Sequence, residues 1–372
     1  MRIVLAPDSF KGTATQQQVA AALERGLRRG WGRSLDVETR LMADGGEGTA
    51  DIFVNAGALW VPEVVHDAYG RPRQAGWARH GAIGIVEAAQ GSPYVPPADR
   101  PASVLETTSR GTGELVQAAW NHPQVTEVWV ALGGSGCVDG GMGLLDALGA
   151  KFYDREGRSL QPRVPNWPRV ARIDLPALKK PVRVLADVWV PLLGPDGALQ
   201  MFGPQKGLDQ EKARELEPDL EHFAACLGPG LASSPGAGAA GGMGAALAAL
   251  GAHLTRGAEW IAERTELAAA VSRADLVVTG EGRMERQSLV GKVVGVVLDH
   301  ARKAHVPAVV VAGSIPDDLG PFYQRGLSFA LALGREPRES LKALADTERD
   351  LEAAGETLGR MLCVASAMRK GD

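Results

Sequence analysis

A chain of 372 residues is longer than one ordinary hydrophobic core and predicts two domains. The hydrophobic fraction of 45%, the charged fraction of 23% and the net charge of -4 are typical of a globular protein, and without a long basic run we expect no nucleic-acid partner. The three cysteines are scattered and odd in number, so neither a disulfide framework nor a CxxC zinc site is expected.

The first apolar run stops at Pro7-Asp8, which is too short for the apolar region of a signal peptide. No stretch approaches the roughly 20 apolar residues that span a bilayer. We therefore expect a cytoplasmic protein in a reducing compartment, with no membrane partner. The sequence leaves the oligomeric state open, a homodimer included.

Two strand-and-helix units open the chain. The apolar run Ile3–Ala6 predicts a buried strand, and a second strand is expected at about Val37–Leu41. An apolar pattern at helical spacing follows each strand, which favours a parallel sheet with right-handed crossovers. The polar residues placed after these two strands are Asp8, Ser9, Lys11, Asp44 and Glu47.

Near residue 62 the sequence pattern changes to short segments of alternating apolar and polar residues, separated by turns such as Tyr69-Gly70-Arg71-Pro72. Such segments suit a mixed sheet. Alternating strands and helices return in the last third of the chain. We therefore predict an α/β protein with a parallel-sheet domain formed by residues 1–62 and 272–372, interrupted by a mixed α/β domain at 63–271.

Five strands are predicted for the parallel sheet, two from the N-terminus and three from the last third of the chain. The three later strands are expected at Asp275–Val278, Val306–Ala312 and Leu327–Leu333. In the middle of the chain, Pro181–Ala186 predicts a strand that ends at Asp187. The segment Phe202–Gly207, which contains Lys206, is expected to be a polar loop, and a helix start is expected at Thr107–Glu114.

The segment Glu127–Gly149 predicts a strand, a glycine loop and a helix, and the strand Val128–Leu132 can belong to either sheet. Six glycines lie among the eleven residues Gly133–Gly143. Glycine lets backbone N–H groups approach a ligand, and a following helix N-terminus favours an anion such as phosphate. A tight connection whose glycines serve only packing is an equally good interpretation.

Several carboxylates are predicted to follow strands directly, and ligands of open α/β sheets bind beyond the carboxyl ends of strands. Carboxylates beside lysines are what a magnesium-dependent site for a phosphorylated ligand requires. The alternatives without a functional role are that Asp8 and Asp44 cap helices and that Lys206 and Lys292 are solvated surface charges. The residues predicted to follow strands directly are Asp8, Asp44, Asp187 and Glu281, and Asp139 follows a strand through the glycine loop.

Several long motifs follow one another along the chain: Pro7–Gly12, Met42–Thr49, Phe202–Gly207, Gly236–Gly242, Thr279–Arg283 and Gly291-Lys292. In this order they resemble the motifs of the bacterial glycerate kinase family, the type without a Walker motif. This resemblance implies ATP- and magnesium-dependent phosphorylation of D-glycerate, most often at the 2-hydroxyl. It also implies a Rossmann-like domain and a mixed α/β domain with the active site in the cleft between them.

We predict the following roles within this site. Asp187 is the general base, and Lys11 and Lys292 act on phosphate or on the glycerate carboxylate. The candidate Mg²⁺ ligands are Asp44, Glu47, Asp139 and Glu281. Substrate and phosphate contacts are expected from Asp8, Ser9, Gly134, Ser135, Gly136, Lys206, Gly280 and Arg283.

The chain departs from the family's pattern at a few polar positions. Gly136, Cys137 and Val138 interrupt the glycine-loop motif, Val190 stands where the family has Asn, and Glu285 stands where it has Asp. These changes leave two alternatives open. One is a kinase for another small hydroxy acid, and the other is a paralogue that binds ligand without turnover.

Overall fold

The structure is a computed structural model that describes residues 1–334 and 339–368. The chain folds into two compact units. We call Met1–Asp44 with Ala258–Asp372 the parallel unit, and Gly45–Gly257 the mixed unit, after their main sheets. Within the described ranges, no helix has both the length and the apolar character to cross a membrane.

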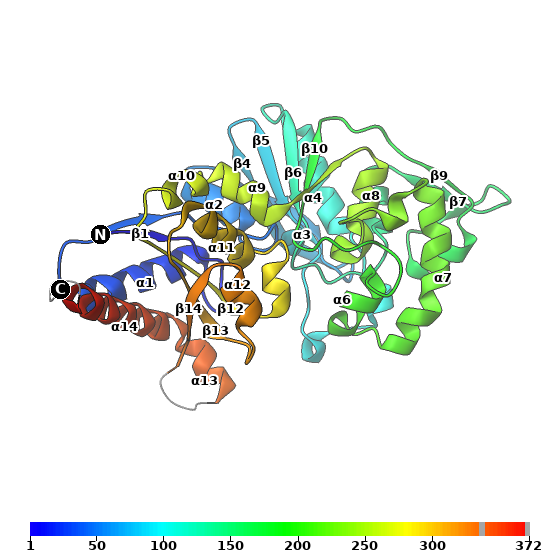
Figure 1. Cartoon of the computed structure of the whole chain (residues 1–372). Helices are drawn as coiled ribbons and strands as arrows, with labels where there is room; N and C mark the ends of the chain where they lie inside the picture. Colours follow the sequence, from blue (N-terminus) through cyan, green and yellow to red (C-terminus); the bar gives the residue numbers. More distant parts are fainter. Residues whose placement is uncertain (335–338, 369–372) are drawn as a thin grey trace. The chain divides into compact units, whose positions relative to one another are not determined.

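The parallel unit is built on a five-stranded sheet whose paired strands all run parallel, as predicted. The strand order is β14-β13-β12-β1-β2. The buried runs Ile3–Leu5 of β1 and Leu276–Val278 of β12 are apolar on both faces, and helices cover the sheet (Figure 1). The strands are β1 (Arg2–Leu5), β2 (Asp36–Thr39), β12 (Leu276–Arg283), β13 (Ala308–Ser314) and β14 (Leu327–Ala332).

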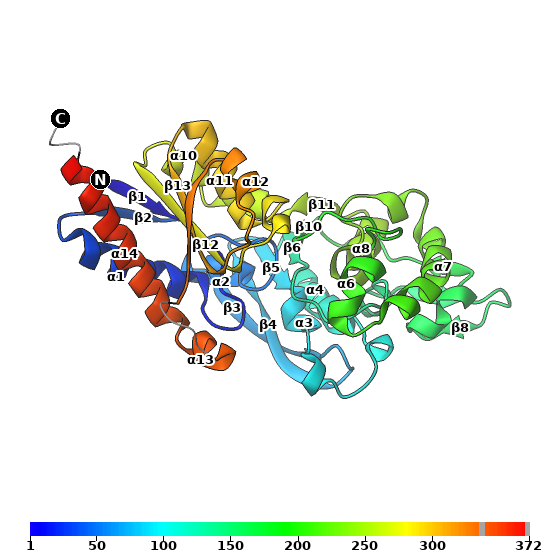
Figure 2. The same ribbon diagram turned by 60° about the horizontal axis from the view of Figure 1, so that its bottom comes forward.

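The helices of this unit include two long ones that lie side by side, α1 and α14 (Figure 2). Their backbones come close because glycines face the contact: a Cβ at Gly26 would lie 2.0 Å from the carbonyl oxygen of Glu352. The α-helices are α1 (Gln16–Trp31), α9 (Gly257–Arg264), α10 (Leu267–Val271), α11 (Val293–Ala304), α12 (Gly320–Gln324), α13 (Ser340–Ala345) and α14 (Thr347–Met368).

The mixed unit has a six-stranded sheet in the order β11-β10-β6-β5-β4-β3. Strands β5, β6, β10 and β11 pair in parallel, while β3 and β4 add an antiparallel edge. The predicted strand at Val128–Leu132 is β6, near the centre of this sheet. The strands are β3 (Leu59–His66), β4 (Pro72–His80), β5 (Ile83–Glu87), β6 (Glu127–Ala131), β10 (Val182–Ala186) and β11 (His253–Arg256).

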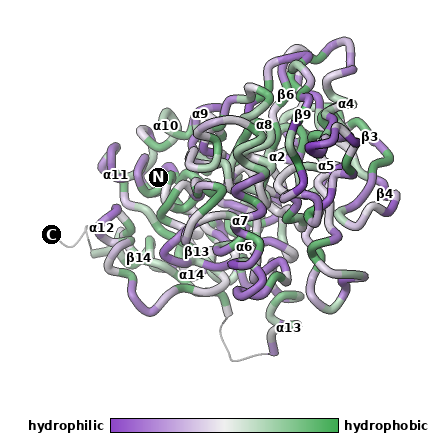
Figure 3. The backbone as a smooth tube through the Cα atoms, turned by 90° about the vertical axis from the view of Figure 1, so that its right-hand side faces the viewer, coloured by the Kyte–Doolittle hydropathy of each residue, from purple (hydrophilic) through white to green (hydrophobic). Residues whose placement is uncertain are grey.

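A small antiparallel sheet and seven α-helices complete the described part of the mixed unit. The sheet consists of β7 (Lys151–Tyr153), β8 (Ser159–Leu160) and β9 (Arg172–Asp174). Hydrophobic and hydrophilic stretches alternate along the chain, as expected when each element buries one face (Figure 3). The helices are α2 (Thr49–Asn55), α3 (Ala88–Gly91), α4 (Arg110–Asn121), α5 (Met142–Ala147), α6 (Ala198–Lys206), α7 (Gln210–Leu227) and α8 (Met243–Ala249).

The two units divide at positions other than those predicted. The breaks lie at Asp44/Gly45 and Gly257/Ala258, whereas we expected residues 62 and 272. Helix α2 and strand β3 pack against β4, so they belong with the mixed sheet, and α10 packs against α11 of the parallel unit. The prediction followed a change in local sequence texture, but packing decides which unit an element joins.

Two local predictions also need correction. Strand β12 extends through Arg283, so Glu281 lies inside a strand and not after one. Lys206 is the last residue of helix α6 and not part of a loop, and Gly207 ends that helix with positive φ. Helix α4 begins where expected, and its first N–H, that of Arg110, donates to the Thr108 hydroxyl at 3.2 Å.

Candidate active site

Asp8 and Asp44 are both buried in the parallel unit, beyond the carboxyl ends of β1 and β2. The ammonium group of Lys11 lies 3.5 Å from Asp44 Oδ2, and the Ser9 N–H donates to Asp8 Oδ1 at 2.7 Å. Burial raises the pKa of Asp8 well above its ordinary value, and the charge of Asp44 raises it further. Two carboxylates held together away from water favour a bound cation.

Neither aspartate caps a helix. Thr15 caps α1 through its side chain, and the N-cap of α2 is Gly48, whose position has no side-chain bond. This removes the structural alternative proposed from sequence for both residues. Their burial instead brings them to the edge of the sheet where α/β proteins bind ligands.

Glu281 joins the same group of charges from β12. Burial raises the pKa of Glu281 to about 7, against the lowering effects of a hydrogen bond from Ser288 and the charge of Lys292. Its pKa also responds to the charges of Asp44 and Lys11. Among the described residues, the buried atoms Glu281 Oε1 and Ser9 Oγ have no hydrogen-bond partner. Buried polar atoms without partners are costly, and a ligand or ion would satisfy them.

The other predicted site residues of the parallel unit, Lys292, Arg283 and Gly280, differ in their burial and contacts. Lys292 is half-buried at the N-cap of α11, where a helix N-terminus also favours an anion. Arg283 is exposed and forms an ion pair with Glu285 at 2.6 Å. Gly280 packs against β13, since a Cβ there would lie 2.3 Å from the carbonyl oxygen of Val311. Gly280 thus has a packing reason of its own.

The glycine loop Gly133–Gly143 follows β6 in the mixed unit. Gly134 has a φ of +80°, and at Gly136 a Cβ would lie 2.3 Å from the carbonyl oxygen of Pro93. Side chains at these positions would strain or displace the backbone. The Gly136 N–H donates to the carbonyl of Ser92 at 2.8 Å, so the neighbouring segment holds the loop in place.

Lys206 reaches the glycine loop from the end of α6. Its buried ammonium group donates to Ser135 Oγ at 3.1 Å and to the Cys137 carbonyl at 2.9 Å. Burial lowers the pKa of Lys206, while the nearby acidic groups, Asp187 and Asp139 among them, raise it. Lys206 is therefore not a solvated surface charge, and it holds the loop at two points.

Asp187 follows β10 directly and is half-buried. A Cβ at Gly133 would lie 3.0 Å from Asp187 Oδ2, so this carboxylate lies against the start of the glycine loop. The structure thus brings together Asp187, Lys206 and Ser135 around one loop. Glu47 lies beside the same loop, since a Cβ at Gly134 would be 3.7 Å from the Glu47 Cβ, and its side chain is exposed.

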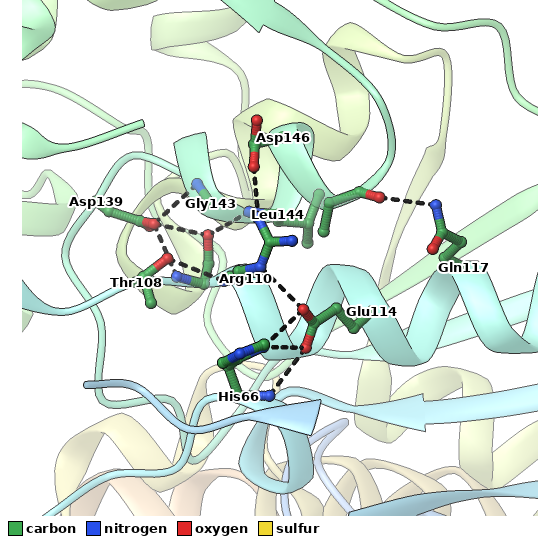
Figure 4. Close-up of polar contacts among 11 residues, drawn as sticks. His66, Thr108, Arg110, Glu114, Gln117, Asp139, Gly143, Leu144 and Asp146 are labelled. Atoms are coloured by element: carbon green, nitrogen blue, oxygen red, sulfur yellow. Dashed lines mark hydrogen bonds and ion pairs between the residues drawn. The ribbon is translucent and has the colours of Figure 1, made fainter. Parts of the chain in front are cut away.

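We expected Asp139 to be a metal ligand, but donors from the protein itself occupy its carboxylate oxygens. Its Oδ2 accepts from the Ser109 N–H at 2.7 Å, the Ser109 hydroxyl at 2.9 Å and the Gly143 N–H at 3.0 Å. Its Oδ1 accepts from the Gly141 N–H at 3.0 Å. Figure 4 shows Asp139 beside Gly143 and Leu144 of α5. Burial raises the pKa of Asp139, and these four donors act against that rise.

Three residues with a part in these contacts were not predicted from sequence: Ser109, Glu87 and Ser288. Ser109 links Asp139 to the Leu144 N–H, which donates to its hydroxyl at 2.8 Å. Glu87 is buried at the end of β5, and Ser288 hydrogen-bonds to Glu281. Ser109 lies in the segment Thr107–Glu114, which was predicted only as a helix start. No strand was predicted before Glu87, so the local sequence carried no signal for its contacts.

Within the described residues, no three or more His, Cys, Asp or Glu side chains are grouped closely enough to hold a metal ion by themselves. Mg²⁺ in phosphotransferases takes one or two carboxylates together with phosphate oxygens. Carboxylates and lysines beside strand ends and a glycine loop before a helix define an α/β enzyme of the phosphotransferase class.

The chain belongs to the glycerate kinase family, whose sequence model matches residues 3–363. It is 40% identical to the glycerate 2-kinase of Escherichia coli K12 over 346 residues, which cover 88% of this chain and 89% of the relative. It is 36% identical to a glycerate kinase of Bacillus subtilis 168, over 95% of this chain and 97% of the relative.

A solved structure from Salmonella typhimurium LT2, described as a candidate glycerate kinase 2, has the same fold. The TM-score is 0.80, the sequence identity is 34%, and the match covers 99% of both chains. The resemblance inferred from the sequence motifs is thereby confirmed at the level of the family and the fold.

Proposed function

We propose that this protein transfers the terminal phosphoryl group of ATP to the 2-hydroxyl of D-glycerate in a magnesium-dependent reaction. The observation that carries the proposal is the match to the glycerate kinase family along nearly the whole chain. The 2-position is favoured by the E. coli relative, which is named a glycerate 2-kinase. Burial of Asp8, Asp44 and Glu281 beside two lysines supports the chemistry.

The parallel unit fits a magnesium-bound phosphate. Glu281 has a buried oxygen without a partner, and the raised pKa values of Asp8 and Glu281 reflect carboxylates held away from water and near like charge. Asp44 and Glu281, with Asp8 nearby, would hold Mg²⁺, which neutralises charge on the phosphate oxygens when it is bound. Lys11 and Lys292 offset the remaining phosphate charge.

In the mixed unit, the phosphate lies against the glycine loop beside the Ser135 hydroxyl, because the Gly133, Gly136, Gly141 and Gly143 N–H groups already donate within the protein. Lys206 keeps the loop in this conformation. Asp187 accepts the proton of the attacking hydroxyl, since phosphoryl transfer needs a carboxylate that orients the nucleophile. Glu47 lies next to the same loop and is available to a metal ion. Asp139 has a structural part, because its oxygens are already saturated by donors.

An assay of the purified protein with ATP, Mg²⁺ and D-glycerate tests this function. We expect glycerate-dependent release of ADP, and phosphorus NMR of the product should show the phosphate on the 2-position. A panel of C3 and C4 hydroxy acids separates a glycerate kinase from a kinase for another acid. Binding of nucleotide in a calorimeter without ADP release would indicate a non-catalytic paralogue.

The general base can be tested by Asp187→Asn. Removing the proton acceptor should lower kcat about 10²- to 10⁴-fold, with a smaller effect on KM. The matched control is Asp196→Asn, an exposed aspartate in the following segment, which should leave kcat unchanged. Full turnover by the Asp187 variant would remove Asp187 from this role and leave the overall reaction standing.

A further inference from the structure

Glu87 is a buried acidic residue that the reaction as described does not use. It is the last residue of β5 and pairs in register with Ala131 of β6, directly before the segment that leads into the glycine loop. Its side chain is only 3% exposed. A carboxyl group buried at the carboxyl edge of a parallel pair of strands needs a structural or functional reason.

The carboxyl group of Glu87 accepts hydrogen bonds from a distant loop. The Ala50 N–H donates to Oε1 at 2.6 Å, and the Gly48 N–H also bonds to this carboxyl group. The short helix α2 begins at Thr49 after a glycine that offers no side-chain cap. Glu87 therefore satisfies N–H groups at the start of α2 from 37 residues further along the chain.

The loop that Glu87 holds, Gly45–Thr49, packs directly on the glycine loop. The Gly133 N–H donates to the Gly45 carbonyl at 3.1 Å, and a Cβ at Gly133 would lie 2.6 Å from the Cα of Gly46. Glu47 lies at the exposed side of this loop, next to Gly134. Thr49 closes the loop through a 2.7 Å hydrogen bond from its hydroxyl to the Gly46 carbonyl.

We propose that Glu87 is a positioning residue for phosphoryl transfer: its carboxyl group fixes the Gly45–Thr49 loop so that Glu47 stays beside the glycine loop. This inference rests on the proposed function, because Glu47 acts only if the site binds a phosphorylated ligand with its cation. Glu87 does not touch the ligand and acts through the backbone of Gly48 and Ala50.

The electrostatic setting agrees with an anchoring role. Burial, together with the charges of Asp51 and Glu47, raises the pKa of Glu87 to about 8, against the lowering effect of the hydrogen bonds from the Ala50 and Gly48 N–H groups. The side chain is thus mostly neutral near pH 7, which lets it accept backbone hydrogen bonds at a small desolvation cost. Glutamine, which is neutral and nearly isosteric, should keep the carbonyl acceptor for the Ala50 N–H.

A double-mutant cycle tests the coupling between Glu87 and Glu47. We expect Glu87→Ala to lower kcat/KM for ATP about tenfold, because the loop loses the buried hydrogen bonds from the Gly48 and Ala50 N–H groups, and Glu87→Gln to restore it to within about threefold. In a Glu47→Gln background, Glu87→Ala should cost less than about twofold, because the residue it positions is gone. Equal losses in both backgrounds, or normal turnover by Glu47→Gln, would overturn the proposal.

Amide hydrogen exchange provides a readout that does not need turnover. Exchange at residues 46–50 should rise about tenfold in Glu87→Ala, stay near wild type in Glu87→Gln, and remain unchanged in α7 of all variants. Unchanged exchange at residues 46–50 in the alanine variant overturns the anchoring role, whatever the kinetics. If the wild type shows no glycerate phosphorylation while exchange behaves as expected, the proposed function fails and the anchor stands.

Discussion

Replacing Asp139 by asparagine should destabilise the mixed unit. In the better of the two amide orientations, the carbonyl oxygen takes the place of Oδ2 and keeps the two bonds from Ser109 and the one from Gly143. The amide nitrogen then faces the Gly141 N–H, which is left without an acceptor. A buried N–H left without an acceptor costs about 1–3 kcal/mol.

The three bonds that remain also weaken, because a neutral amide oxygen accepts less strongly than a carboxylate. If each loses about 0.5 kcal/mol, the total loss in the free energy of unfolding is about 3 kcal/mol. That loss is a large part of the stability of an ordinary domain. The effect should be local to the glycine loop and the starts of α4 and α5, which this carboxylate joins.

Urea denaturation followed by tryptophan fluorescence measures the loss. Trp167 lies in the affected region, since its Nε1–H donates to the Asp139 carbonyl at 3.3 Å. Asp146→Asn is the matched control: Asp146 belongs to α5 but forms a partly exposed ion pair with Arg110 at 2.6 Å, visible in Figure 4, and should cost less than about 1 kcal/mol. A loss below about 1 kcal/mol for Asp139→Asn would refute the reasoning. Unchanged stability with a raised Mg²⁺ requirement would restore the metal-ligand interpretation.

Two further outcomes are expected. Lys206→Met should lower kcat/KM at least about tenfold by releasing the glycine loop. The free energy of unfolding should change by less than about 1 kcal/mol, because burying the ammonium group is itself costly. Normal turnover by this variant in the ADP-release assay would contradict the anchoring role of Lys206. The pKa of Glu87 is raised from 4.5 to about 8, so its contribution to stability is complete below about pH 4.5 and is lost as the pH rises through 8. Glu87→Gln should therefore flatten the fall in unfolding free energy over this interval, as measured by urea titrations at several pH values, and an identical pH profile would show that Glu87 ionises normally.

Much of the fold followed from local patterns. The five strands of the parallel sheet are short runs of β-branched and apolar residues, and each was expected within a few residues of its place, although β12 runs on through Arg283. The order of strands and helices required a parallel sheet. Strand ends were less certain, because glycine and charged residues at 279–283 read as a loop, while pairing with β13 keeps them extended.

Some candidate site residues were also placed correctly from the sequence, whereas the contacts of others were not predictable. Asp8, Asp44 and Asp187 were placed from their positions after strands. The burial of Lys206 was not predictable, because a lysine at the end of α6 is buried only when the glycine loop packs over it. Nor was the partner of Asp139, since Ser109 lies 30 residues away in the sequence.

The sequence by itself determined the family, the alternation of strands and helices, and the set of acidic, basic and glycine residues from which a phosphotransfer site is built. These depend on side-chain type and on spacing over a few residues. Only the tertiary structure decided which of those side chains meet. In the folded chain, four donors bond to Asp139, Glu281 keeps one oxygen without a partner, and Glu87 bonds to the loop before α2. These contacts join segments far apart in the chain, so hydrogen bonding and burial could not be predicted from local sequence.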